Sequence, residues 1–307
     1  MKITTKNMNK NKMFWFNTTS QLLIGLTFIA SGFLKAIDIY GTELKLIEYA
    51  NNLDFNFLRE YNVFLSVILC SFEIFLGLWL VTFVYKRLSL IVLIATMLFF
   101  SGIIIYFKIN PEKEIIDCGC FGEILPTEMT KSLIKNIVIL LFGCCLLWSE
   151  RTKETFFHIG PIVIILICII SSLPLPLYTA EKLSLYNPTE YRIGINLNEK
   201  ENFILLNDDF ENVKDSLLGK TEKVYIFILK KSPNRLEENN IKEISQICVK
   251  EDASCFALST NKYELIDEVT QYFTDKATLN SLVRSRDNGI VTLINGIIDN
   301  VMILNDY

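Results

Sequence analysis

The sequence predicts an α-helical membrane protein with five transmembrane helices, followed by a C-terminal α/β domain. Hydrophobic residues make up 51% of the 307 positions, and the mean hydropathy of +0.34 is too high for an ordinary soluble protein. Five apolar runs are predicted to span the membrane, and the first is long enough to cross a hydrocarbon layer of about 30 Å. From about residue 181 the chain becomes charged and shows the alternating pattern of a soluble domain.

The composition of the chain argues against two kinds of partner, nucleic acid and a metal ion bound by histidines. The formal net charge is -4, and nucleic acid binding requires a concentrated basic face, so we expect no nucleic acid partner. A single histidine, His158, cannot build a histidine-rich metal centre, and we assign no metal site. Membrane lipid is the expected surrounding of the apolar runs.

The apolar runs divide the chain into domains. Residues 1–13 contain four lysines and no acidic residue, as is typical of a cytoplasmic flank. The first run is too long for a signal-peptide core and no small-residue cleavage site follows it, so we expect it to remain as a helix. The spans are predicted at about 14–37, 63–84, 88–107, 133–148 and 159–178. The resulting domains are a tail (1–13), a four-helix transmembrane domain (14–149), a fifth transmembrane helix (150–180) and the C-terminal domain (181–307).

The loop charges predict the orientation of these spans. Lys86 and Arg87 lie between the second and third spans, and Arg151 and Lys153 lie between the fourth and fifth, whereas the first and third loops are richer in Asp and Glu. Because positive charge marks cytoplasmic loops, the N-terminus is expected in the cytoplasm and the C-terminal domain outside. For a bacterial inner membrane the outside is the periplasm, where thiols can form disulfides.

Two ionisable residues lie within the predicted spans. Lys35 is near the outer end of the first span, and Glu73 is in the second. A charged side chain in lipid is costly and therefore usually faces a partner or a cavity. If these spans are antiparallel neighbours, Lys35 and Glu73 can pair in the outer half of the bilayer. Alternatively, Lys35 extends its aliphatic stem along the helix so that its amine reaches the interface.

The loop before the fourth span, Asp117-Cys118-Gly119-Cys120-Phe121-Gly122, contains two cysteines one residue apart. Glycine tolerates the backbone angles of a tight ring, so Cys118 and Cys120 can form a strained disulfide. Strained, exposed disulfides are readily exchanged, which suits redox chemistry. The same pair can instead form half of a metal site or remain as two thiols in a turn. The Asp117 carboxylate should raise the pKa of Cys118, which makes Cys120 the expected nucleophile.

The first four spans resemble the DoxX-like superfamily of four-helix membrane proteins, and in particular its methylamine-utilisation MauE branch. The resemblance covers about residues 18–149. Its matching pieces are Ser31-Gly32-x-x-Lys35, Tyr49, Glu73, the 117–122 loop and Lys135-Asn136. It implies a bundle similar to that of quinone-linked disulfide oxidases, a role in redox maturation of exported proteins, and a quinone as candidate cofactor. Such oxidases carry a second periplasmic cysteine pair and a Cys-x-x-Cys motif, which this chain lacks.

The C-terminal part has the pattern of an α/β domain. An apolar run at 224–229 is suited to a buried central strand. The amphipathic segment 236–249 has isoleucines at helical spacing, and a short strand at 255–258 and a helical stretch at 263–274 follow. Two last strands, 289–294 and 297–304, are joined at Asn295-Gly296, which is a strong hairpin signal.

This β-α-β-α-β-β order is similar to that of a thioredoxin-like domain, with two departures. Residues 230–235, which follow the first strand, contain no Cys-x-x-Cys, and Asp287-Asn288-Gly289 stands where a cis-proline would precede the hairpin. The domain therefore resembles a redox-inactive thioredoxin fold retained for docking. Cys248 and Cys255 are its thiols, and they form either a structural disulfide or two buried free thiols.

Two functions from different classes follow from these observations. In the first, the chain is an inner-membrane thiol–disulfide component in which Cys118 and Cys120 exchange with exported proteins or a respiratory partner. The C-terminal domain presents these proteins, and a quinone or a partner protein resets the cysteine pair. In the second, the chain is a non-catalytic membrane scaffold or assembly factor whose cysteines only stabilise a loop.

Overall fold

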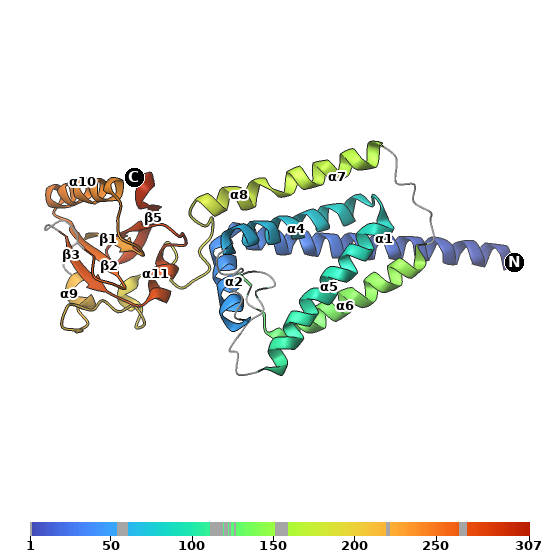
Figure 1. Cartoon of the computed structure of the whole chain (residues 1–307), viewed down its shortest axis with the longest axis horizontal. Helices are drawn as coiled ribbons and strands as arrows, with labels where there is room; N and C mark the ends of the chain where they lie inside the picture. The colour runs from blue at the N-terminus through green and yellow to red at the C-terminus, as the bar shows by residue number, and fades with distance from the viewer. Residues whose placement is uncertain are drawn as a thin grey trace. The chain divides into compact units, whose positions relative to one another are not determined.

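The computed structural model comprises two compact units, Met1–Ala180 and Glu181–Tyr307 (Figure 1), and each is described by itself. The structure describes residues 2–53, 61–110, 119, 122, 124–125, 127–150, 159–218, 222–263 and 269–307. Within these ranges it describes all side chains except those of residues 2–12, 14 and 159.

The first unit is helical, and its described part contains five helices long and apolar enough to cross a membrane. Its helices are α1 (Lys2–Ile37), α2 (Ile39–Leu53), α4 (Asn62–Thr82), α5 (Lys86–Ile109), α6 (Met129–Ser149), α7 (Ile159–Ser172) and α8 (Pro174–Glu181). The membrane-spanning candidates are Trp15–Ile37, Asn62–Thr82, Lys86–Ile109, Met129–Ser149 and Gly160–Glu181. The prediction of a helical, multi-pass membrane part is confirmed.

Two features of this unit differ from the sequence-based expectation. Residues 39–53 were expected as loop but form α2, which is separated from the end of α1 by one residue and is buried at its N-terminal end. The predicted fifth span is divided at Leu173, between α7 and α8. The cause of this division is Pro174, because the residue before a proline disfavours the helical conformation, whereas a proline is well tolerated at the first position of a new helix.

Helices α1 and α4 lie side by side (Figure 1) and approach each other closely at glycines. A Cβ atom added to Gly77 would lie 2.6 Å from the carbonyl oxygen of Gly25 and 2.7 Å from the amide nitrogen of Ile29. A Cβ atom added to Gly32 would lie 2.8 Å from the amide nitrogen of Ile74. Small residues of this kind allow helix backbones to pack directly in a membrane. The close approach brings the facing polar side chains of α1 and α4 within direct reach of each other.

The second unit is built on a five-stranded mixed sheet with the strand order β3-β2-β1-β4-β5. Its elements are η1 (Leu197–Glu199), α9 (Lys214–Leu218), β1 (Lys223–Leu229), α10 (Arg235–Glu251), β2 (Ser254–Ser259), β3 (Thr270–Phe273), α11 (Lys276–Leu282), β4 (Gly289–Ile294), β5 (Ile297–Ile303) and η2 (Leu304–Asp306). Strands β1, β2 and β3 are parallel, and β4 and β5 are antiparallel to their neighbours. This confirms an α/β domain after the helical membrane part.

Strand β1 is buried on both faces, as its continuous apolar run predicted. One face contributes Val224, Ile226 and Ile228 to a core that also contains Leu279 and Leu282 of α11. The other face contributes Tyr225, Phe227 and Leu229, which pack in one cluster with Ile241, Ile244 and Cys248 of α10. The central strand therefore joins two apolar layers, one on each side of the sheet.

The predicted helix at 263–274 is wrong. Thr270–Phe273 forms strand β3, and residues 264–268 lie outside the described part of the chain. The strand forms because β2 offers an edge for parallel pairing. Thr270 to Phe273 pair in register with Phe256 to Ser259 of β2. Its other edge is bridged by Leu206, whose amide and carbonyl exchange hydrogen bonds of 2.9 and 2.8 Å with Phe273. The hairpin at Asn295-Gly296 was predicted correctly, and both residues have positive φ, at 52° and 78°.

Candidate functional site

The main polar feature of the membrane unit is a buried ion pair between Lys35 of α1 and Glu73 of α4. The lysine amine donates to both carboxylate oxygens of Glu73, at 2.6 and 2.7 Å. Lys35 is 4% exposed and Glu73 is 3% exposed. The pairing that the sequence suggested is therefore present, and the alternative in which Lys35 extends to the interface is wrong.

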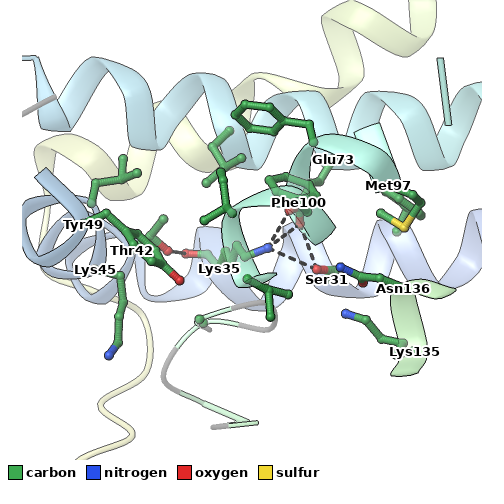
Figure 2. A pocket seen from close by; sticks show the side chains of 18 of the residues that line it. Ser31, Lys35, Thr42, Lys45, Tyr49, Glu73, Met97, Phe100, Lys135 and Asn136 are labelled. Atoms are coloured by element: carbon green, nitrogen blue, oxygen red, sulfur yellow. Dashed lines mark hydrogen bonds and ion pairs between the residues drawn. The ribbon is translucent and has the colours of Figure 1, made fainter. Parts of the chain in front are cut away.

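Ser31 completes this arrangement from the same face of α1 (Figure 2). Its hydroxyl donates to Glu73 Oε2 at 2.8 Å and accepts from the Lys35 amine at 3.2 Å. Residues four apart lie on one face of a helix, so the Ser31–Lys35 spacing directs both side chains at Glu73. Gly32 lies between them and permits the close contact with α4 described above. The Ser31-Gly32-x-x-Lys35 motif thus has a specific geometric meaning.

A cavity of about 220 Å³ opens beside the ion pair. Residues of α1, α2, α4, α5 and α6 line it, and most of its wall is apolar. Phe28, Tyr49, Phe99 and Phe100 supply aromatic rings, and aliphatic side chains and Met97 fill much of the remainder. Ser31, Lys35 and Glu73 form part of the lining, together with two polar residues from α6. An apolar hollow with a few polar groups is the usual form of a small-molecule site.

The two polar residues from α6 are Lys135 and Asn136, which extend toward the ion pair in Figure 2. Asn136 is 1% exposed, and its amide nitrogen Nδ2 is buried without a hydrogen-bond partner in the described part of the protein. A buried amide that lacks a partner is costly, so such groups are few in proteins and each requires a reason. The structure therefore brings together three of the predicted polar residues, Lys35, Glu73 and Asn136.

Of the 117–122 loop, the structure describes the two glycines. Gly119 and Gly122 both line the cavity, and the Gly122 amide donates to the Gly119 carbonyl oxygen at 3.0 Å. Their φ angles of 58° and 68° lie in the left-handed region that favours glycine. A Cβ atom added to Gly122 would lie 3.5 Å from Lys35 Cα, and one added to Gly119 would lie 3.3 Å from Lys45 Cγ. The loop glycines therefore pack against lysines that line the same cavity.

The remaining predicted site residues of that loop, Asp117, Cys118 and Cys120, lie outside the described residues. Their roles stay predictions. Gly119 separates the two cysteines in the sequence.

In the C-terminal unit, the side chain of Asn288 joins the backbone after β1 to helix α10 by hydrogen bonds. Its side-chain oxygen accepts from the amides of Lys230 and Lys231 at 2.9 and 3.1 Å. Its amide nitrogen donates to Lys231 O and to Glu237 Oε2, both at 3.1 Å. Four bonds from one fully buried side chain make Asn288 a structural clamp between these segments.

The neighbouring Lys230 amine and the two cysteines of this unit are also held in fixed environments. Lys230 donates to the carbonyl oxygens of Val283 and Ser285, both at 2.6 Å, and burial together with nearby Arg284 lowers its pKa to about 7. Cys248 and Cys255 are not joined by a disulfide in the structure. The contact with Cys255, and then burial, raise the pKa of Cys248 well above its ordinary value, which keeps this thiol protonated and unreactive.

The sequence reasoning missed the contribution of α2 and α5 to the cavity. Tyr49 was noted as part of a motif, but Thr42 and Leu46 on the same helix and Phe100 on α5 were not considered. Thr42 donates to the Lys35 carbonyl oxygen at 3.4 Å, which links α2 to the end of α1. The apolar residues at three- and four-residue spacing in 39–53 were the available signal for this helix.

Comparisons with known proteins give two similarities. Residues 13–149 match the family model described as methylamine utilisation protein MauE. The chain is also 27% identical, over 154 residues, to Protein TlpB of Flavobacterium psychrophilum. This match takes in 49% of the chain and 42% of that protein, so the chain spans less than half the length of this relative. The predicted MauE resemblance of the membrane domain is confirmed, and the thioredoxin-like assignment of the C-terminal domain stays a prediction.

Proposed function

We propose that this chain, whose residues 13–149 match the MauE family model, is an inner-membrane thiol–disulfide component that assists the maturation of exported proteins or of a respiratory partner. In this proposal Cys118 and Cys120 are the reactive pair. The N-terminus is cytoplasmic, and the C-terminal α/β domain is periplasmic and presents the substrate protein. A membrane-soluble electron acceptor or a partner protein returns the pair to its oxidised state.

The observation that carries this proposal is the position of Gly119 and Gly122. Both line a cavity that also contains a buried ion pair and an unsatisfied amide inside a membrane bundle. Ionisable groups in a bundle interior are costly and usually mark a functional site. A cysteine-containing loop whose glycines border such a site is well placed to pass electrons between a protein outside the membrane and a molecule within it.

The proposed exchange balances as a two-electron reaction. A dithiol of the exported protein forms its disulfide and gives up two electrons and two protons. The Cys118–Cys120 bond breaks, and the two cysteines take up these two electrons and two protons and become thiols. The acceptor then removes two electrons and two protons from Cys118 and Cys120, and their bond forms again. The exchange is reversible, and in the reverse direction a thiolate of the reduced pair attacks a disulfide of the exported protein. Since Asp117 is expected to raise the pKa of Cys118, Cys120 is the proposed attacking sulfur in that direction.

The C-terminal domain serves docking rather than exchange in this proposal. Its β-α-β order with a terminal hairpin supports a thioredoxin-like assignment. The segment that would carry the reactive cysteines in such a domain contains none, and Asn288 fixes it by four hydrogen bonds. A domain of this kind keeps a binding surface without competing for electrons with Cys118 and Cys120.

Alkylation of thiols in intact cells, followed by mass spectrometry, tests the proposal. We expect a mixture of oxidised and reduced Cys118–Cys120 in the wild-type protein. Cys120→Ser should abolish function. In Cys118→Ser the remaining Cys120 thiolate should attack disulfides of exported proteins, release one of their thiols and stay in a mixed disulfide, because the second thiol of the pair is not there to resolve it. A matched control is Cys144→Ser with Cys145→Ser, whose thiols are exposed on α6 and should have no effect.

The alternative of a non-catalytic scaffold or assembly factor predicts the opposite result. Under that alternative, a Cys118→Ser/Cys120→Ser variant supports normal growth and leaves the disulfide content of exported proteins unchanged. This outcome would remove the thiol–disulfide proposal.

The proposed orientation has its own test. A reporter that is active only in the periplasm, fused after Tyr307, should be active, because the basic residues around Lys86-Arg87 mark the cytoplasmic side. Activity of a cytoplasm-only reporter at the same position would reverse the orientation and remove the redox argument with it.

A further inference from the structure

The cavity contains a hydrogen-bond donor that the described part of the protein does not satisfy. Asn136 Nδ2 is buried and has no partner there, and Asn136 lines the cavity. The ammonium group of Lys135 comes from the adjacent position of the same helix and lines the cavity as well (Figure 2). An amide N–H beside a cation is complementary to an oxygen that accepts a hydrogen bond and carries partial negative charge.

The size and walls of the cavity restrict what could bring this oxygen. An apolar protein cavity of about 150 Å³ holds one benzene ring, so the 220 Å³ found here has room for a substituted or bicyclic ring but not for a whole phospholipid. Phe28, Tyr49 and Phe100 supply flat aromatic surfaces, which favour stacking with another ring. Because the surrounding helices span the membrane, such a ring can enter from the lipid phase.

From this geometry we infer that the cavity binds the ring of a quinone, with a ring carbonyl oxygen accepting a hydrogen bond from Asn136 Nδ2. This inference rests on the proposed function, because it names the electron acceptor and its site. The Lys35–Glu73 pair is internally neutral, so it places no net charge against the ring. Gly119 and Gly122 line the same cavity, so these two glycines border the ring site.

In the reaction at this site, the quinone takes up the electrons and protons that the cysteines release. Cys118 and Cys120 lose two electrons and two protons, and the S–S bond forms. The quinone gains both electrons and both protons, and its two carbonyl groups become hydroxyl groups. Asn136 acts here as a residue that binds and orients the ring oxygen.

Binding of menadione, a naphthoquinone without a lipid tail, to the purified full chain in detergent tests the inference. Loss of one hydrogen bond to a ring carbonyl should weaken binding by about tenfold, so we expect this loss in Asn136→Leu. Ser132→Ala is the matched control, because Ser132 is a buried polar residue one turn away on α6 that is not part of the cavity lining. Naphthalene, which has the ring but no oxygen, should bind equally to the wild type and to Asn136→Leu, which also shows that the variant is folded.

The outcomes separate this inference from the proposed function. Cys118→Ser/Cys120→Ser should bind menadione as the wild type does, since the ring site uses no thiol. The quinone site is overturned if menadione does not bind saturably or binds equally to Asn136→Leu. It is also overturned if menadione is bound no better than decanoate, a fatty acid that has no ring. Each of these results counts even if the cysteines cycle in cells. If menadione binds as expected while the cysteines do not cycle, the ring site stands and the proposed function fails.

Discussion

Replacing Glu73 by glutamine should destabilise the membrane unit strongly, because it leaves the Lys35 ammonium buried without its anion. The substitution preserves side-chain shape and removes the charge that accepts at 2.6 and 2.7 Å. The reverse substitution, Lys35→Met, keeps the length of the side chain and leaves the carboxylate with the Ser31 hydroxyl as its remaining partner among those described above.

The expected magnitude follows from the burial of both groups. Lys35 and Glu73 are almost fully enclosed, and removing one partner of a buried pair typically costs about 3–5 kcal/mol. The double variant Lys35→Met/Glu73→Gln contains no unpaired charge, so its loss should be smaller than the sum of the two single losses. The difference is the coupling free energy of the pair.

The free energy of unfolding can be measured by SDS titration of the purified full chain in mixed micelles, followed through tryptophan fluorescence, to which the buried Trp79 contributes. The matched control is the ion pair of Lys131 on α6 with Glu128, the N-cap residue of that helix, whose side chains are 71% and 70% exposed. Exposed pairs contribute about 0–1 kcal/mol, so Lys131→Met, Glu128→Gln and their combination should change the unfolding free energy little.

Additive losses in the Lys35 and Glu73 variants would refute the reasoning, because independent sites show no coupling. Single losses as small as those of the Lys131 and Glu128 variants would do the same, since they would show that water or lipid headgroups reach the pair.

Three further predictions concern the packing and the C-terminal domain. Gly77→Ala should cost about 1–3 kcal/mol by forcing α1 and α4 apart, whereas Gly102→Ala, where an added Cβ meets nothing within 4 Å, should be neutral in the same SDS titration. Asn288→Ala should raise hydrogen exchange in the peptides of β1 and α10, because four hydrogen bonds are lost, while the exposed Asn300→Ala should not, and equal exchange in both variants would show that the clamp is dispensable. Partial burial acts to raise the pKa of Asp275, but hydrogen bonds from Thr278 hold it below its usual range. At pH values above the ordinary pKa of this carboxyl, Asp275→Ala should therefore lower the free energy of unfolding by about 0.5–1 kcal/mol. This loss should disappear as the pH falls through the lowered pKa, and a loss that persists in acid would contradict this origin.

Some properties of this chain can be predicted from stretches of neighbouring residues. The five apolar spans follow from local hydropathy, because a helix that crosses lipid must satisfy its backbone within one segment. The Asn295-Gly296 hairpin and the buried strand β1 follow from turn chemistry and from an uninterrupted apolar run. The pairing of Lys35 with Glu73 was one of two alternatives in the sequence, and the close packing of α1 against α4 decided between them.

Other properties depend on contacts between distant segments, and only the tertiary structure decided them. Thr270–Phe273 became a strand because β2 offered an edge for pairing, although its residues lie in a stretch that resembled a helix. The role of Asn288 as a clamp depends on its distance from Lys230 and Lys231, some 57 residues earlier in the chain. The cavity beside Asn136 exists because five helices leave a space between them that their side chains do not fill. No local pattern encodes a void, since its volume depends on how the helices pack against one another.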